Sequence, residues 1–134
     1  MTPRTFTPEE ANAALPDVRP LAEEMAVAHR ALAAAERRRA ALAVKIAGDG
    51  GDLDPGELGA LAAAVEQEAA AVERCVEAIQ ALGCLVKDTE RGLVDFPALR
   101  GGEQVLLCWQ LGEDEVAWWH GLEDGFAGRR PLPF

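Results

Sequence analysis

The fold is decided by the stretch Gly48-Asp49-Gly50-Gly51-Asp52, which separates two long segments of helical pattern. Three glycines and two aspartates in five positions are typical of a flexible loop. On both sides of this loop, mostly apolar residues recur in steps of three and four, as on the face of a helix that packs against another helix. Two such faces joined by a short loop predict an antiparallel helical hairpin with coiled-coil-like packing. The two faces are Val18, Leu21, Met25, Ala28, Leu32, Ala35, Arg39, Leu42 and Ile46, then Leu58, Leu61, Val65, Glu68, Val72, Cys75, Ile79 and Leu82.

Prolines near the N-terminus predict a break in the first helix. Thr7 and Glu10 have the spacing of a capping box, with Pro8 at the first helical position. Pro16 and Pro20 then interrupt the helical pattern. We therefore expect a short helix over 8–14, a bend, and a long helix over 17–47, with the second helix beginning after Asp54-Pro55 and ending before Gly83.

Two polar residues interrupt the apolar faces of the hairpin. Folding the chain back at the loop brings Arg39 near Glu68, either as an ion pair that fixes the helix register or as part of a polar site. His29 would lie near Cys75, where it is either a partly exposed structural residue or the beginning of a metal site. The structural interpretation is favoured in both cases.

After Gly83 the pattern changes from helical to alternating. Strands are expected over 84–87, 93–96 (ended by Pro97), 104–111 and 115–121, with Gly112-Glu113 as a two-residue turn before the last strand. A helix over 113–121 is the alternative. The chain is thus predicted to be one α+β domain over 1–134, with the hairpin in 1–82 packed on a small antiparallel β-sheet of about four strands in 83–134.

The expected two-residue turn fixes which residues share a face of the sheet. It places Leu107 opposite Trp118 and Val105 opposite His120. One face would cover the hairpin, and the other would meet a second subunit or the C-terminal segment. Cys108 is expected to be a small core residue rather than a nucleophile. The predicted faces are Val105, Leu107, Trp109, Val116, Trp118 and His120 on one side, and Leu106, Cys108, Ala117 and Trp119 on the other.

Composition excludes several classes of function. The 134 residues carry a net charge of −10 and a pI near 4.6, which disfavours nucleic acid and anionic membranes as partners. The sequence contains no serine, so a Ser-His-Asp hydrolase is excluded. No signal peptide or membrane-spanning stretch is visible, and three widely spaced cysteines suit reduced thiols. We therefore expect a cytoplasmic protein.

The C-terminal half holds the candidate site. His120 is expected at a strand end near acidic residues, and Asp95 lies between Val94 and Phe96, where a carboxylate needs a partner. One interpretation pairs Asp95 with Arg129. The other predicts a divalent metal (zinc, iron or manganese), with Arg129 anchoring a small anionic ligand. The predicted metal ligands are His120, Asp95, Glu113 and Glu115, and the predicted ligand-binding residues are Arg129, Lys87, Asp124 and Trp119.

Short motifs along the whole chain are shared with a known family. They include Phe6-Thr7, Glu10-Ala11-Asn12, Leu15-Pro16, Val86-Lys87-Asp88, Gly92-Leu93-Val94-Asp95-Phe96-Pro97, Leu107-Cys108-Trp109, Leu111-Gly112-Glu113, Trp119-His120 and Gly125-Phe126-Ala127-Gly128-Arg129. Together they resemble domain-of-unknown-function family 2203, a small bacterial family. The resemblance implies almost nothing about activity, because that family is named for lacking one. It does imply that a polar set belongs to the family signature, namely Lys87, Asp88, Asp95, Glu113, His120 and Arg129.

Two functional hypotheses follow. In the first, the β-rich half binds a divalent metal or a small anionic ligand, and whether the protein is an enzyme is left open. In the second, the protein is a non-catalytic interaction module that forms homo-oligomers through the hairpin and the second apolar face of the sheet.

Overall fold

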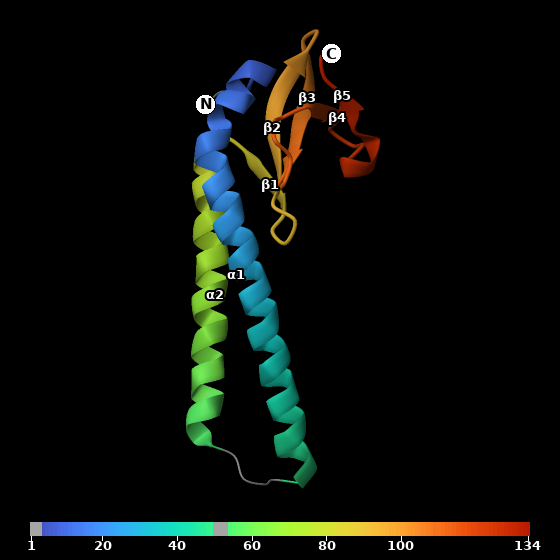
Figure 1. The fold of residues 1–134 in the computed structure, drawn as a ribbon. Helices are drawn as coiled ribbons and strands as arrows, with labels where there is room; N and C mark the ends of the chain where they lie inside the picture. Colours follow the sequence, from blue (N-terminus) through green and yellow to red (C-terminus); the bar gives the residue numbers. More distant parts are fainter. Residues whose placement is uncertain (1–3, 50–53) are drawn as a thin grey trace.

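Two antiparallel helices and a five-stranded antiparallel sheet make up the part of the chain that the computed structural model describes, residues 4–49 and 54–134. The helices form a long hairpin, and the sheet lies beside one end of it, so the other end projects well beyond the sheet (Figure 1). This is the predicted α+β architecture, with five strands rather than about four. Residues 50–52 of the predicted glycine-rich loop lie outside the described residues. The elements are α1 (Pro8–Asp49), α2 (Pro55–Ala81), β1 (Leu85–Asp88), β2 (Leu93–Arg100), β3 (Glu103–Gln110), β4 (Trp118–Gly121), the 3-10 helix η1 (Phe126–Gly128) and β5 (Arg130–Pro131).

Helix α1 does not break at its prolines. The expected short helix over 8–14 and long helix over 17–47 are one continuous helix that contains Pro16 and Pro20. The predicted bend survives as a change of direction, because the first turns of α1 lie at an angle to the rest of the helix (Figure 1). Each internal proline removes one backbone hydrogen bond and costs about 3 kcal/mol in an isolated helix, so other contacts must hold these turns in place.

Caps and packing supply those contacts. The predicted capping box is present, with the Thr7 N–H donating to Glu10 Oε1 at 2.9 Å and the Glu10 N–H donating to Thr7 Oγ1 at 3.1 Å. Just before the helix, the Phe6 N–H donates to the carbonyl of Pro97 in β2 at 2.7 Å. Tertiary contact therefore overrides the proline signal. The buried apolar residues of these turns are Ala11, Leu15 and Val18.

The helix faces predicted from the spacing pack together near the sheet and become exposed far from it. Met25 and Ile79 are fully buried, whereas Ile46 is exposed. Arg39 is also exposed, and it forms no ion pair with Glu68 in the described part of the chain, so that prediction is wrong. None of the described helices is long and apolar enough to cross a membrane.

His29 is a partly exposed residue, as the structural interpretation expected. Its Nδ1 lies 2.8 Å from Thr89 Oγ1, and its Nε2 lies 3.9 Å from Glu90 Oε2. Both partners belong to the turn between β1 and β2. His29 therefore attaches this turn to α1.

The strand β2 continues past Pro97, which was expected to end it. The N atom and the carbonyl of one residue in a strand point to the same side, and the carbonyl of Pro97 accepts its hydrogen bond from Phe6. The missing N–H of Pro97 therefore faces the side beyond the end of β1, where no ladder bond is lost. Gly101 and Gly102, with φ of 57° and 86°, then make the turn into β3.

The register between β3 and β4 differs by one residue from the prediction. Leu107 pairs with Trp119 rather than Trp118, and His120 pairs with Leu106 rather than Val105. A one-residue shift exchanges the two faces of a strand, so Trp119 faces the helices and His120 faces outward. The helix-facing residues of the sheet, which form the main core, are Val94, Phe96, Ala98, Val105, Leu107, Trp109 and Trp119.

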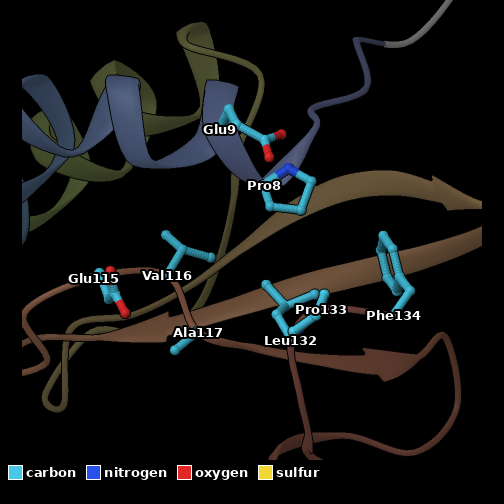
Figure 2. Close-up of a pocket in the computed structure, with 8 residues that line it drawn as sticks. All are labelled: Pro8, Glu9, Glu115, Val116, Ala117, Leu132, Pro133 and Phe134. Atoms are coloured by element: carbon cyan, nitrogen blue, oxygen red, sulfur yellow. The ribbon is translucent and has the colours of Figure 1, made fainter.

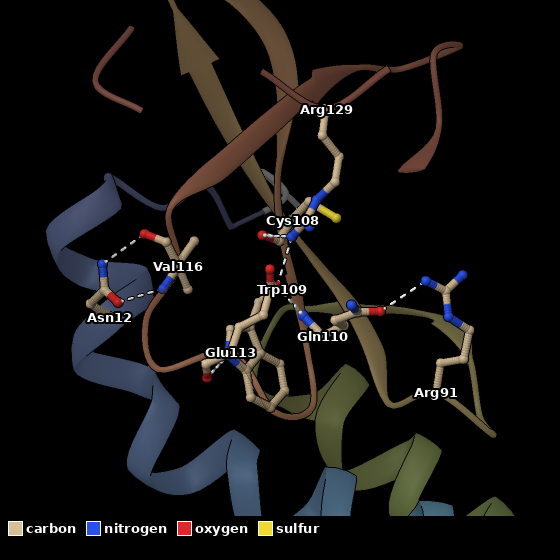
Figure 3. A network of polar contacts seen from close by, with 8 residues as sticks. All are labelled: Asn12, Arg91, Cys108, Trp109, Gln110, Glu113, Val116 and Arg129. Carbon is tan, nitrogen blue, oxygen red and sulfur yellow. Dashed lines mark hydrogen bonds and ion pairs between the residues drawn. The ribbon is translucent and has the colours of Figure 1, made fainter. Parts of the chain in front are cut away.

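The physical cause of the shift is a long loop where a two-residue turn was expected. Residues 111–117 connect the strands, and β4 begins only at Trp118, which also excludes the alternative helix over 113–121. Asn12 of α1 holds this loop: its Oδ1 accepts from the Val116 N–H at 2.7 Å, and its Nδ2 donates to the Val116 carbonyl at 3.2 Å (Figure 3). Trp109 Nε1 donates to the carbonyl of Glu113 at 3.0 Å. The side chains of Asn12, which is distant in sequence, and of Trp109, which is close, therefore satisfy backbone groups of this loop.

Candidate metal centre

Three metal-ligating side chain types meet on the outer face of the sheet. Asp95 of β2 lies directly opposite Cys108 of β3 in the register, and His120 of β4 pairs with Leu106, two residues from Cys108. One carboxylate oxygen, the thiol sulfur and one imidazole nitrogen lie within 4.8 Å of one another, and all three residues are buried. Adjacent strands hold residues on one face at this spacing, so the sheet itself positions the cluster.

The hydrogen bonds of His120 fix the state of its ring. Nδ1 lies 2.7 Å from the carbonyl of Gly121, which can only accept, so Nδ1 carries a proton. Nε2 lies 3.1 Å from Asp95 Oδ2, and this contact needs one proton on either the ring or the carboxyl group. A metal ion could replace that proton, because both atoms offer a lone pair to the same place. A metal-binding histidine commonly donates its other N–H to a carbonyl in this way.

Asp95 is strongly buried and only partly satisfied. Its residue is 1% exposed, and its Oδ1 accepts no hydrogen bond from any residue that the structure describes. Burial raises the pKa of this carboxyl group above its usual value, while the charge of His120, a hydrogen bond with the Cys108 thiol and the charge of Lys87 act in the opposite direction. A buried carboxylate oxygen without a donor is costly, and coordination of a cation would satisfy it.

Cys108 is a protonated thiol when no metal is bound. Burial, together with the negative charge of Asp95, raises its pKa to about 12. This environment excludes a free nucleophilic thiolate at neutral pH. A coordinated metal would deprotonate the sulfur, as metal ions do with thiol ligands.

The spacing of the cluster is close to that of a tetrahedral site. Metal–ligand bonds of about 2.0–2.3 Å separate two ligands on one zinc ion by about 3.3–3.7 Å. The observed separations reach at most 4.8 Å, so a shift of about 1 Å would close the site. Three protein ligands would leave a fourth position free.

A small pocket opens beside the cluster. Its volume is about 150 Å³, and Asp95 and His120 form part of its wall. Lys87 also lines it, and Lys87 is the one cationic side chain among these lining residues. The rest of the wall is Leu93, Leu106, Leu122, Gly125 and Phe126. A ligand in this pocket would therefore meet both polar groups of the cluster and apolar side chains.

The family follows from comparison of the whole sequence. The model of a family described as an uncharacterised conserved protein, DUF2203, matches residues 4–132. The chain belongs to this family. No curated protein and no solved structure matches it. The evidence for the chemistry of this DUF2203 protein therefore lies in its own side chains.

The predicted partners Glu113 and Arg129 bind each other instead of the cluster. Arg129 Nη2 donates to Glu113 Oε1 at 2.7 Å and to the carbonyl of Cys108 at 3.2 Å (Figure 3). The alternative ion pair between Asp95 and Arg129 is therefore wrong, because the carboxyl group of Asp95 faces His120. The Arg129 guanidinium also lies 5.1 Å from the Trp118 ring centroid, so it fastens the C-terminal segment over the outer face.

The structure places three further predicted site residues away from the cluster. Glu115 is exposed and lines a separate hollow of about 420 Å³ between the start of α1 and the C-terminus (Figure 2). Asp124 Oδ2 accepts from the Gly121 N–H at 3.1 Å and shapes a turn. Trp119 lies in the core on the opposite face of the sheet from His120. The predicted set thus keeps Asp95, His120 and Lys87 around the pocket.

Sequence analysis missed Cys108 as a member of the cluster. In the expected register, Cys108 and His120 lay on opposite faces of the sheet. The one signal available was the predicted position of Asp95 in an apolar strand, which showed that the outer face needed a polar partner. With the observed register between β3 and β4, His120 of this DUF2203 chain lies on the same face as Cys108.

Proposed function

We propose that the protein binds a divalent transition metal, zinc first of all, through Asp95, Cys108 and His120. The observation that carries this proposal is the meeting of a carboxylate oxygen, a thiol sulfur and an imidazole nitrogen from three adjacent strands within 4.8 Å. Burial of all three, and the carboxylate oxygen without a donor, support it.

The set of donor atoms favours zinc or a neighbouring metal. A thiolate and an imidazole suit zinc, iron and cobalt, whereas magnesium and calcium require oxygen ligands. With three protein ligands, the fourth position would face the pocket lined by Asp95 and His120. Closed structural zinc sites have four protein ligands, so an open position is typical of a site that also binds water or a small molecule.

The test is cobalt(II) titration of the full-length chain, followed by metal analysis after zinc loading. We expect about one metal ion per chain and, with cobalt, a near-ultraviolet absorption band from charge transfer between thiolate and metal. Cys108→Ser should abolish the band. Cys84→Ser is the matched control, because Cys84 is also buried but lies outside the cluster, so it should keep the band.

Two results would refute the proposal. One is a wild-type protein that binds substoichiometric metal even after loading. The other is a band of equal intensity in the Cys108→Ser variant.

We propose self-association through the projecting end of the hairpin as a second candidate function. Val44 and Leu58 are 73% and 42% exposed there, and the sheet does not cover them. This part of α1 carries the cations Arg38 and Lys45, whereas Glu57 lies on α2. Two antiparallel hairpins could pair α1 of one copy with α2 of the other and bring these charges together.

Sedimentation at tens of micromolar tests this self-association. A dimer that is weakened by Val44→Glu supports it, and a wild-type monomer refutes it.

A further inference from the structure

The pocket beside the proposed metal centre shares two wall residues with a second hollow. Leu106 and Leu122 line both the 150 Å³ pocket and a neighbouring hollow of about 220 Å³. The outer-face residues Leu85 and Pro97 also line the second hollow, together with the helix-facing residues Ala98 and Val105. We call the two together the outer trough.

The outer trough is polar at one end and apolar at the other. Lys87, Asp95 and His120 belong to the first pocket, and none of the described residues that line the second hollow is charged. Leu85 and Leu122 are 38% and 57% exposed, although large apolar side chains gain free energy from burial. Two exposed leucines in one concave surface indicate a place for an apolar group.

Charge decides which polar group fits the first end. A divalent ion bound by the carboxylate of Asp95 and the thiolate of Cys108 is neutral overall, and Lys87 adds one positive charge. Before metal binding, the shared proton leaves the Asp95–His120 pair neutral overall, so Lys87 again leaves the pocket positive. An anionic head group is therefore favoured at this end in both states.

We propose that the outer trough binds a small amphiphilic carboxylate, namely a straight-chain acid. The carboxylate would pair with Lys87 and take the fourth position on the metal, and the chain would lie over Leu106 and Leu122 toward Pro97. The head-group end of this inference rests on the proposed metal site. The apolar end rests on the hollow alone.

Chain length is the sharpest probe of the apolar end. Burying one methylene contributes about 0.8 kcal/mol, which is about fourfold in affinity, and an open groove gives less. We expect the affinity to rise about threefold for each methylene from butanoate to octanoate. Calorimetric titration of the zinc-loaded and metal-free full-length chain with butanoate, hexanoate and octanoate measures this slope.

Substitutions at Lys87 and Leu122 test the polar end and the apolar end of the outer trough separately. Lys87→Gln should weaken all three acids about fivefold without changing the slope, and Leu122→Gln should flatten the slope. Both residues are exposed, so these variants should fold. The controls are Arg30→Gln and Leu99→Gln, which remove an exposed positive charge and an exposed leucine outside the trough and should behave as wild type. Octanol, which lacks the charge, should bind more weakly than octanoate.

The outcomes distinguish this inference from the proposed function. If zinc binds but affinity is independent of chain length, or if octanol binds as tightly as octanoate, the trough inference is overturned and the metal site stands. If zinc does not bind but the slope and the Leu122→Gln effect persist in the metal-free chain, the proposed function fails and the trough is supported.

Discussion

Asp95 is the residue whose environment most opposes its charge. Burial raises the pKa of its carboxyl group above 3.8, so the folded chain holds this proton more tightly than the unfolded chain does. The stability that the proton supplies is complete below about pH 3.8 and is lost as the pH rises through the folded pKa. Without a metal, the ionised carboxylate at neutral pH therefore costs stability. We infer that this loss of folding stability is retained because the ionised carboxylate is needed at the proposed metal site.

Asp95→Asn should increase the stability of the metal-free protein and abolish its stabilisation by zinc. The amide avoids burying a charge and can donate to His120 Nε2, so the metal-free variant should be more stable than wild type by about 1 kcal/mol at pH 7. The difference should grow as the pH rises from about 4 to 8, and the rise in Tm on adding zinc should disappear. Urea unfolding at several pH values measures this. A variant that is less stable at every pH would contradict the account of Asp95.

Metal binding should release protons from identified groups. Cys108, with a pKa of about 12, loses its thiol proton, and the proton shared by His120 and Asp95 is displaced. We therefore expect release of about two protons per zinc ion near pH 7. Calorimetry in buffers of different ionisation enthalpy counts them. In Cys108→Ser the number should fall by about one, and an unchanged count would exclude the thiol as a ligand.

At the scale of elements, the attachment of the loop over 111–117 to α1 sets the position of β4. Asn12 satisfies both backbone groups of Val116, which is 3% exposed. Asn12→Ala leaves these buried groups without partners and should cost about 1–3 kcal/mol in the free energy of unfolding.

Asn12→Asp separates the contribution of the side-chain acceptor from that of the side-chain donor. It keeps an oxygen that accepts from the Val116 N–H but loses the donor to the carbonyl, so its loss should be smaller. Denaturant unfolding of both variants gives the comparison. Equal losses would show that the acceptor has no separate role.

The same loop explains what the sequence could and could not predict. The helical hairpin, the capping box and the alternating strands follow from local patterns, and these were confirmed. The faces on which Trp119 and His120 lie, and therefore the meeting of His120 with Cys108, depended on the register of β4. That register is set by Asn12, which lies 104 residues from Val116 in the sequence. Pattern arguments do not contain such a contact, so Asp95 and His120 were identified as candidates while Cys108 was missed.

At the scale of the whole molecule, the proposed metal site and much of the hairpin occupy different parts of the structure. The cluster and its pocket are formed by the sheet and the C-terminal segment, whereas much of the hairpin projects beyond the sheet (Figure 1). Leu42→Ala, at a position 7% exposed in the hairpin, should cost about 2 kcal/mol. Cobalt titration under native conditions should give an unchanged band and affinity. A weaker metal affinity would mean that the two parts are coupled.

The order of the three cluster residues along the chain has a consequence for biosynthesis. During translation Asp95 is synthesised first, Cys108 follows thirteen residues later, and His120 comes last, after both helices have emerged. Helical hairpins are held by local contacts and form quickly, so this part can fold without any ion. At the proposed site, the nascent chain would thus become able to capture a cation only after His120 has emerged and the three neighbouring strands have aligned.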